Sequence, residues 1–408
     1  MVRGRHVFYV EGYDPQGAEG YYRLFQRLRK GIHCIWQCQA NLGELTLDSD
    51  LIAHWKIEAW GPNWRVTTRY HFLRLEHMIS AEMEEPTVRH VPRALGWMLD
   101  YLITGTMIRI LRASWRFGLH LLYFQAVLLL WLGLAVAGGW LAADAIATIG
   151  LPQLVTVAVG VTAGVAALVI LRPLAERSHA VQGNSCWPSL SKFARGQESG
   201  LDAPIEACAE RLVAAVRADE ADEIVVVGHS WGGAIAPTIV ARALELDPDL
   251  GRRRARLVLL TLGSIMAAAA LHPGAARLRA VMRRLAVEPS LRWFDCHSHK
   301  DVLSCGFDPV DAIGNELGRE RRNPLPWPVR LRDMVLDDLY GRLRWNFLRI
   351  HYQYIMANDR RAPYDYFMVT CGPIPVEEWA ARGHDLVAAF SLDGAYAAAA
   401  VAPPLAVK

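Results

Sequence analysis

The sequence predicts an α/β fold, with a mostly parallel sheet flanked by helices, and a two-helix transmembrane hairpin inserted into it. Short apolar runs that are typical of buried strands alternate with segments of helical periodicity, which indicates parallel strands joined by helices. The chain has 408 residues, 52% of them hydrophobic, and two long stretches near its middle carry no charge. An ordinary soluble domain is less apolar, so we expect a soluble α/β domain together with a membrane segment.

Charge and cysteine content exclude several classes of protein. The formal net charge is only +3, and the arginines are scattered rather than gathered in one basic stripe, so no nucleic-acid partner is expected. Seven cysteines without a CxxC pair indicate a reduced, cytosol-facing protein. The apolar run at the N-terminus is too short for a signal peptide, so export of the whole chain is not expected.

The membrane hairpin is predicted from two uncharged stretches, residues 121–143 and 145–171. Each meets the roughly 20 residues that a helix needs to cross a bilayer core, and we place the spans at about 121–143 and 149–171. Small residues in both stretches favour closely packed membrane helices. The alternative is a pair of helices buried inside a large soluble core.

Arginines flank the hairpin on one side only, because the connecting turn contains neither Lys nor Arg. The positive-inside rule therefore predicts that both termini and the large flanking segments are cytoplasmic. The flanking arginines are Arg109, Arg112, Arg116, Arg172 and Arg177. The richness in alanine and arginine indicates a bacterial inner membrane.

A further apolar stretch, residues 95–111, is interrupted by Asp100 and Arg109. We expect it to form an amphipathic helix at the level of the lipid headgroups, and a third span is the alternative. The expected organisation is an N-terminal part of the α/β domain, an insert, a C-terminal part and a tail. Their ranges are 1–94, 95–177, 178–390 and 391–408.

The elements before the insert begin a strand–helix unit. "HVFYVEGYD" (6–14) is predicted to be a buried strand that ends in a turn, and "GAEGYYRLFQRLRK" (17–30) a helix with one apolar face. "LIAHWKIEAW" (51–60) and "WRVTTRYHFLRLE" (64–76) alternate as strands do. The "GPN" (61–63) between them is a turn signal.

The elements after the insert alternate between helix and strand. Asp202 is a plausible N-cap for the first of these helices, and "YDYFMVTCG" (364–372) is a possible last strand. Before it we predict helices over 202–216, 234–246 and 277–285, and strands over 223–228, 256–264 and 291–297.

A serine lies between two glycines directly after the first strand that is predicted in the C-terminal part of the α/β domain. Gly228-His229-Ser230-Trp231-Gly232 follows a predicted buried strand and precedes a predicted helix, which is the context that a G-x-S-x-G nucleophile turn requires. The flanking glycines remove side chains that would collide at such a sharp turn. The loop lacks the glycine spacing and the lysine of phosphate-binding loops, so Ser230 is a candidate nucleophile.

Through "VVVGHSWGG" (225–233) the sequence resembles the α/β-hydrolase superfamily, and it is similar to lipase and esterase members with a GHSxGG elbow. The resemblance covers residues 1–60 and 178–390 and leaves the membrane segment as an insertion. It implies the chain order nucleophile, acid, histidine. It also implies an oxyanion hole formed by the N–H of Trp231 and by a second donor after the first strand, around Gly12 or Tyr13.

Asp301 is the expected acid, because it follows the strand 291–297 and precedes Val302, like the acid loop of the family. Asp295 and Asp308 are the other acids of this region. His351 is the expected base from the chain order. The alternative base is His384, which would be favoured if 364–372 were the last strand.

These residues predict a membrane-anchored serine hydrolase that cleaves acyl esters, like an esterase or lipase, with a Ser–His–Asp triad. The expected partners are the lipid bilayer and an apolar acyl ester. An acyltransferase or thioesterase would use the same triad, and a non-catalytic membrane scaffold is an alternative from another class. "HSHKD" (297–301) resembles part of a dinuclear metal site, but no metal and no organic cofactor are expected.

Overall fold

The computed structural model describes residues 1–197, 199–314 and 317–397. The chain divides into two compact units, one formed by Met1–Ser80 with Lys192–Lys408 and the other by Ala81–Ser191. The first unit holds the sheet, and the second is helical.

The sheet of the first unit is mixed and mostly parallel, as the sequence predicts. Within the described residues its order is β2-β4-β5-β1-β6-β7-β8-β9, with β3 paired to β4 off this path. Every pair from β5 to β9 is parallel, whereas β2, β3 and β5 meet β4 antiparallel. The strands are β1 Gly4–Val10, β2 Gln39–Leu42, β3 Thr46–Leu47, β4 Ile52–Gly61, β5 Trp64–Leu73, β6 Glu223–His229, β7 Arg256–Leu262, β8 Leu291–His297 and β9 Leu325–Pro328.

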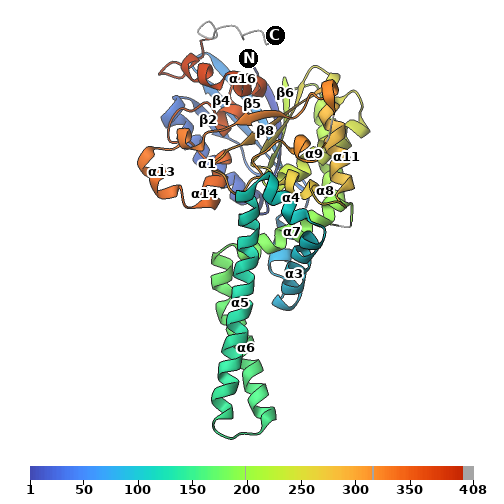
Figure 1. The fold of residues 1–408 in the computed structure, drawn as a ribbon. Helices are drawn as coiled ribbons and strands as arrows, with labels where there is room; N and C mark the ends of the chain where they lie inside the picture. Colours follow the sequence, from blue (N-terminus) through green and yellow to red (C-terminus); the bar gives the residue numbers. More distant parts are fainter. Residues whose placement is uncertain (198, 315–316, 398–408) are drawn as a thin grey trace. The chain divides into compact units, whose positions relative to one another are not determined.

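Helices cover both faces of this sheet, which explains why its central strands are apolar on both sides. On one face α1 (Gly17–Trp36) and α16 (Val376–Ala389) share a hydrophobic core with Tyr9 and Val225. On the other face lie α8, α9 and α11 (Figure 1). The remaining helices of this unit are α8 Asp202–Arg217, α9 Gly232–Leu246, α10 Met266–Ala270, α11 Ala276–Val287, α12 Pro309–Ala312, α13 Asp337–Leu343, α14 Phe347–Tyr352 and α15 Tyr366–Cys371.

The possible last strand at 364–372 is wrong, because Tyr366–Cys371 forms helix α15. The Asp365 side chain caps that helix by accepting a hydrogen bond from Met368 N, and the short edge strand β9 takes the last place in the sheet. A short apolar run fits a buried strand and a buried helix equally well. The N-cap assignment is also wrong, because Asp202 is the first residue of α8 and pairs with Arg277.

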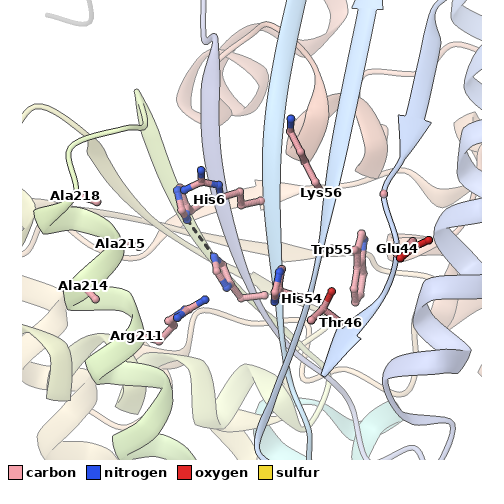
Figure 2. A pocket seen from close by; sticks show the side chains of 13 residues that line it. His6, Glu44, Thr46, His54, Trp55, Lys56, Arg211, Ala214, Ala215 and Ala218 are labelled. Carbon is pink, nitrogen blue, oxygen red and sulfur yellow. Dashed lines mark hydrogen bonds between the residues drawn. The ribbon is translucent and has the colours of Figure 1, made fainter. Parts of the chain in front are cut away.

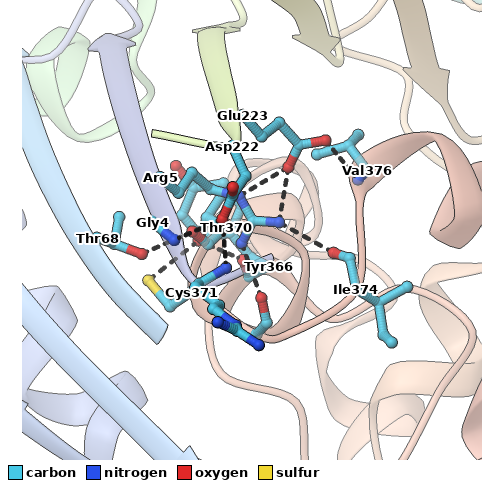
Figure 3. Close-up of polar contacts among 12 residues, drawn as sticks. Gly4, Arg5, Thr68, Asp222, Glu223, Tyr366, Thr370, Cys371, Ile374 and Val376 are labelled. Carbon is cyan, nitrogen blue, oxygen red and sulfur yellow. Dashed lines mark hydrogen bonds and ion pairs between the residues drawn. The ribbon is translucent and has the colours of Figure 1, made fainter. Parts of the chain in front are cut away.

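A buried ion pair at the start of the central strands is hydrogen-bonded to the backbone of residues 372–376 (Figure 3). Arg5 of β1 and Glu223 of β6 lie 2.7 Å apart with fully buried side chains. Arg5 also donates to the carbonyl oxygens of Gly372 and Ile374, and Val376 N donates to Glu223. The polar groups of this buried pair are therefore bonded to backbone that leads into α16.

In the second unit, α5 and α6 are long and apolar enough to cross a membrane. They lie side by side (Figure 1) and pack through glycines. A Cβ on Gly139 would come 2.7 Å from Gly160 O, and one on Gly164 would come 3.3 Å from Ala135 O. Such close approach of backbones is typical of paired membrane helices. The helices of this unit and its border are α2 Glu76–Met83, α3 Thr87–Ile103, α4 Thr106–Ala113, α5 Trp115–Ala147, α6 Gln153–Arg177 and α7 Ala180–Arg195.

The stretch 95–111 is not one continuous helix. It falls on α3 and α4, which are bent by 76° relative to each other. Gly105 at the bend has φ +67°, which lies in the left-handed region. A residue in this conformation often ends a helix, and it is usually a glycine. If this bent pair counts as one span, the described residues contain up to three helical segments that are long and apolar enough to cross a membrane.

Candidate active site

Ser230 occupies the sharp turn between β6 and α9. Its φ is +56°, a left-handed conformation that residues other than glycine rarely adopt. A Cβ on Gly228 would lie 2.5 Å from Gly232 O, and one on Gly232 would lie 2.3 Å from Val10 O. The two glycines of the motif therefore permit the close approach of strand, helix and β1 that this turn needs. Ser230 itself is half-buried.

Asp301 and His351 are brought together although 50 residues separate them in the sequence. Asp301 lies in the loop after β8 and His351 in α14, and His351 Nδ1 is 2.8 Å from Asp301 Oδ2. Both side chains are buried. A carboxylate only accepts hydrogen bonds, so Nδ1 donates to it, and in the neutral imidazole the lone pair is then on Nε2. Among the described residues Nε2 has no hydrogen-bond partner.

Two contacts place this pair at the same sheet edge as Ser230. The ring centroid of His229, the residue before Ser230, lies 4.9 Å from that of His351, and His229 Nε2 is 3.4 Å from His351 O. Ser230 N donates to Leu262 O, and at the next residue, Gly263, a Cβ would lie 2.9 Å from His351 Cε1. The carboxyl ends of β6, β7 and β8 thus surround the serine and the histidine.

His229 is a neutral packing partner in this arrangement. Burial, and then the proximity of His351, hold the pKa of His229 well below its usual value. Its ring therefore adds no positive charge beside His351 at neutral pH. The histidine that contacts the Asp301 carboxylate is His351.

The residues expected at the oxyanion hole lie beside the elbow. A Cβ on Gly12 would come 3.4 Å from Ser230 Cβ. The ring of Tyr13 meets the ring of Trp231 edge-on at 5.5 Å, and both residues are buried. The loop after β1 and the N-terminus of α9 therefore meet at Ser230, which is where backbone donors would have to point.

The other candidate residues lie in different surroundings. His384 is exposed on α16. Burial raises the pKa of Asp295 to about 7, and its carboxylate accepts a hydrogen bond from Thr261 Oγ1. Asp308 caps α12 and pairs with Arg321.

The "HSHKD" stretch was a candidate for part of a metal site. In the described ranges no group of three or more His, Cys, Asp and Glu side chains is arranged to hold a metal ion. Its aspartate, Asp301, contacts His351 instead.

A sequence model of the alpha/beta hydrolase family matches residues 182–400, which is more than half of the chain. The chain belongs to the alpha/beta hydrolase family. Its order of strands, its elbow and the position of Asp301 after β8 agree with that membership. Comparison with curated proteins and with solved structures gave no match.

Near the elbow of this alpha/beta hydrolase lies a polar cluster that the sequence analysis missed. The Tyr352 hydroxyl donates to Asp14 Oδ2, so the residue after His351 is tied to the loop that begins at Glu11. Burial raises the pKa of Asp14, and it raises that of the fully buried Glu11 well above its usual value, with Glu76 and Asp14 adding to the effect. The acidic residues in "VEGYD" were the only available signal, and their partners are distant in sequence.

Proposed function

We propose that this chain is a membrane-anchored serine hydrolase that cleaves acyl esters, with Ser230 as nucleophile, His351 as base and Asp301 as the acid of the triad. The observation that carries the proposal is the buried His351–Asp301 hydrogen bond of 2.8 Å beside a serine in the left-handed elbow conformation. A nucleophile on a strained strand–helix turn, with an oriented imidazole at the same sheet edge, is the arrangement that acyl transfer to serine requires.

In the proposed reaction Ser230 Oγ attacks the ester carbonyl while His351 Nε2 takes its proton. Asp301 holds the imidazole in the required tautomer and stabilises the imidazolium that forms. The N–H of Trp231 and a donor from Gly12 or Tyr13 stabilise the tetrahedral oxyanion. His351 then protonates the leaving alcohol, and water, activated by the same histidine, releases the acyl group from Ser230.

The membrane segment supports an apolar acyl ester as the substrate. Two helices of this chain are apolar enough to cross a bilayer, and an enzyme fixed to the membrane encounters esters dissolved in lipid at high local concentration. We place both termini and the α/β unit on the cytoplasmic side, because the flanking arginines lie on that side of the hairpin and the turn lacks them. The bent pair α3–α4 is then an interfacial element.

Labelling with a fluorophosphonate probe tests the nucleophile and the base. In detergent-solubilised full-length protein we expect labelling to be lost in Ser230→Ala and to fall strongly in His351→Ala, because the probe reacts with an activated serine. His384→Ala is the matched histidine control and should label like wild type. A well-folded wild-type protein that does not react would contradict the proposal.

Hydrolysis assays test the substrate class separately. We expect long-chain esters presented in lipid vesicles to be cleaved faster than short soluble esters at the same concentration. If only the short soluble esters were cleaved, the triad would stand and the apolar substrate would be wrong.

A further inference from the structure

A cavity lies in the α/β unit, away from the elbow. Its volume is about 650 Å³, and the strands β1, β4 and β5 contribute to it together with α8 and the segment before β3 (Figure 2). The basic and imidazole side chains of its lining are His6, His54, Lys56, Arg69, His71 and Arg211. No step of the proposed ester hydrolysis uses any of them.

The strand register explains why these side chains share one face of the sheet. His6 of β1 is paired with Arg69 of β5, and Arg69 with Lys56 of β4. Two residues further along β5, His71 is paired with His54. Paired residues, and residues two apart, point to the same side of a sheet. Five basic or imidazole side chains therefore form two adjacent rows.

Helix α8 forms the facing wall of the cavity. Arg211 extends from α8 toward His54 in Figure 2. Further along α8, Ala214 and Ala215 line the cavity, and so does Ala218 at the C-cap. These short side chains leave space beside Arg211 that a longer residue would fill. Arg211 therefore faces the two rows of side chains on the sheet across an open volume.

His6 and His71, which form the floor of the cavity, can make a further hydrogen bond to a ligand. His6 Nδ1 and His71 Nε2 are 3.0 Å apart, so one ring donates to the other. Buried His71 Nδ1 has no partner among the described residues. When His6 is the donor, a neutral His71 carries its proton on Nδ1 and can donate in turn.

Each of the three cations of the cavity forms an ion pair with a carboxylate that is at least partly exposed. Lys56 pairs with Glu58, Arg69 with Glu220, and Arg211 with Asp48. All three cationic side chains are about half exposed. Exposed pairs of this kind contribute little, and a guanidinium has five N–H donors, most of which one carboxylate leaves unused. The three cationic side chains can therefore bind a ligand instead of their carboxylates without a large loss of stabilising free energy.

We infer that this cavity binds a phosphate-type oxyanion, carried either by a small soluble phosphate ester or by a phospholipid headgroup. Arg69 and Arg211 would grip its oxygens from opposite walls, Lys56 would add a point charge, and the histidine floor would donate a further hydrogen bond. Arginine suits such a ligand because its planar fork matches two oxygens at once. A metal ion does not fit, since the described residues offer no three-ligand group here.

The inferred site is separate from the proposed active site. His6 lies toward the beginning of β1 and Arg69 is its partner on β5, whereas Ser230 follows the carboxyl end of β6. Binding there does not depend on the triad, so the inference and the proposed function can fail independently.

Titration calorimetry of the detergent-solubilised full chain at constant ionic strength tests the inference. The probes are inorganic phosphate, glycerol phosphate and a short-chain phosphatidic acid, with diacylglycerol of the same chain length as the phosphate-free comparison. We expect saturable binding to at least one phosphate-bearing probe and none to diacylglycerol. Binding of the soluble probes would assign the site to a free phosphate ester, and binding of phosphatidic acid alone would assign it to a headgroup.

Matched variants locate the binding. Arg211→Ala and Arg69→Ala should each weaken it by about tenfold or more, as expected for loss of a charge-assisted contact. Arg217→Ala, on the same helix α8 but outside the cavity and paired with Asp247, should bind like wild type, and so should Ser230→Ala. Absence of binding to every probe, an equal loss in Arg217→Ala, an unchanged Arg211→Ala, or a loss in Ser230→Ala would overturn the inference.

Discussion

Gly263 shows at the scale of one residue how closely the backbone approaches the proposed base. Its φ is +54°, and a Cβ there would lie 2.9 Å from His351 Cε1 and 3.1 Å from Asp301 Oδ2. The first distance is shorter than real Cβ contacts, the second is tighter than most of them, and a buried hydrogen-bonded pair has little room to shift. The glycine therefore leaves the space in which His351 and Asp301 meet.

We predict that Gly263→Ala lowers kcat/KM for ester hydrolysis by about a hundredfold, because a displaced imidazole no longer meets the serine. Gly318→Ala is the control, since Gly318 has a similar φ of +51° but a Cβ there would have nothing within 4 Å. Its backbone strain is comparable, and its activity should be near wild type. Equal activity of the two variants would show that His351 does not need the space beside Gly263.

At the scale of elements, the Arg5–Glu223 pair connects β1 and β6 to the segment that leads into α16. We predict that Glu223→Gln lowers the free energy of unfolding by about 3–5 kcal/mol, because it leaves the Arg5 charge buried without a counter-charge. The measurement is thermal or denaturant unfolding in detergent. Glu220→Gln is the control, because its ion pair with Arg69 is exposed and should contribute less than about 1 kcal/mol.

The His6–His71 contact between β1 and β5 predicts a sensitivity to acid. Burial, with Arg69 adding to it, lowers the pKa of His6 from 6.5 to about 4. A folded-state pKa below the unfolded value means that the unfolded chain binds the proton first as the pH falls. The resulting stability is present above pH 6.5 and is lost between about pH 6.5 and 4.

We therefore predict that the wild-type protein loses roughly 3 kcal/mol of stability over this pH window through His6, on the scale of 1.36 kcal/mol per pKa unit. His6→Asn should flatten the pH dependence of unfolding, and His384→Asn, at an exposed position, should leave it unchanged. Parallel pH profiles for wild type and His6→Asn would contradict this origin of the acid sensitivity.

At the scale of the whole molecule, α5 and α6 are the helices that are long and apolar enough to hold this chain in a membrane. Val165 lies near the middle of α6 with its side chain exposed, and a charge at the centre of a membrane helix costs about 2.5–3.5 kcal/mol on insertion. We predict that Val165→Arg increases the fraction of protein that alkaline carbonate extracts from membranes. Leu47→Arg, on an exposed position of β3, should extract like wild type, and equal extraction of both would show that α6 does not cross the bilayer.

The sequence by itself determined most of the architecture, because its signals are local. Hydrophobic periodicity gave the strands and helices on both sides of the insert, uncharged length gave the two membrane-spanning candidates, and glycines around Ser230 gave the elbow. Each of these depends on residues within a few turns or strand lengths of one another.

Only the tertiary structure decided which distant side chains meet. It paired Asp301 with His351 and left His384 exposed, and it gathered His6, His71 and Arg211 around one cavity. It also made 366–371 a helix, although the apolar run alone was compatible with a strand. Such outcomes depend on sheet order, register and packing, which are set by the whole chain and are not encoded in any single window of sequence.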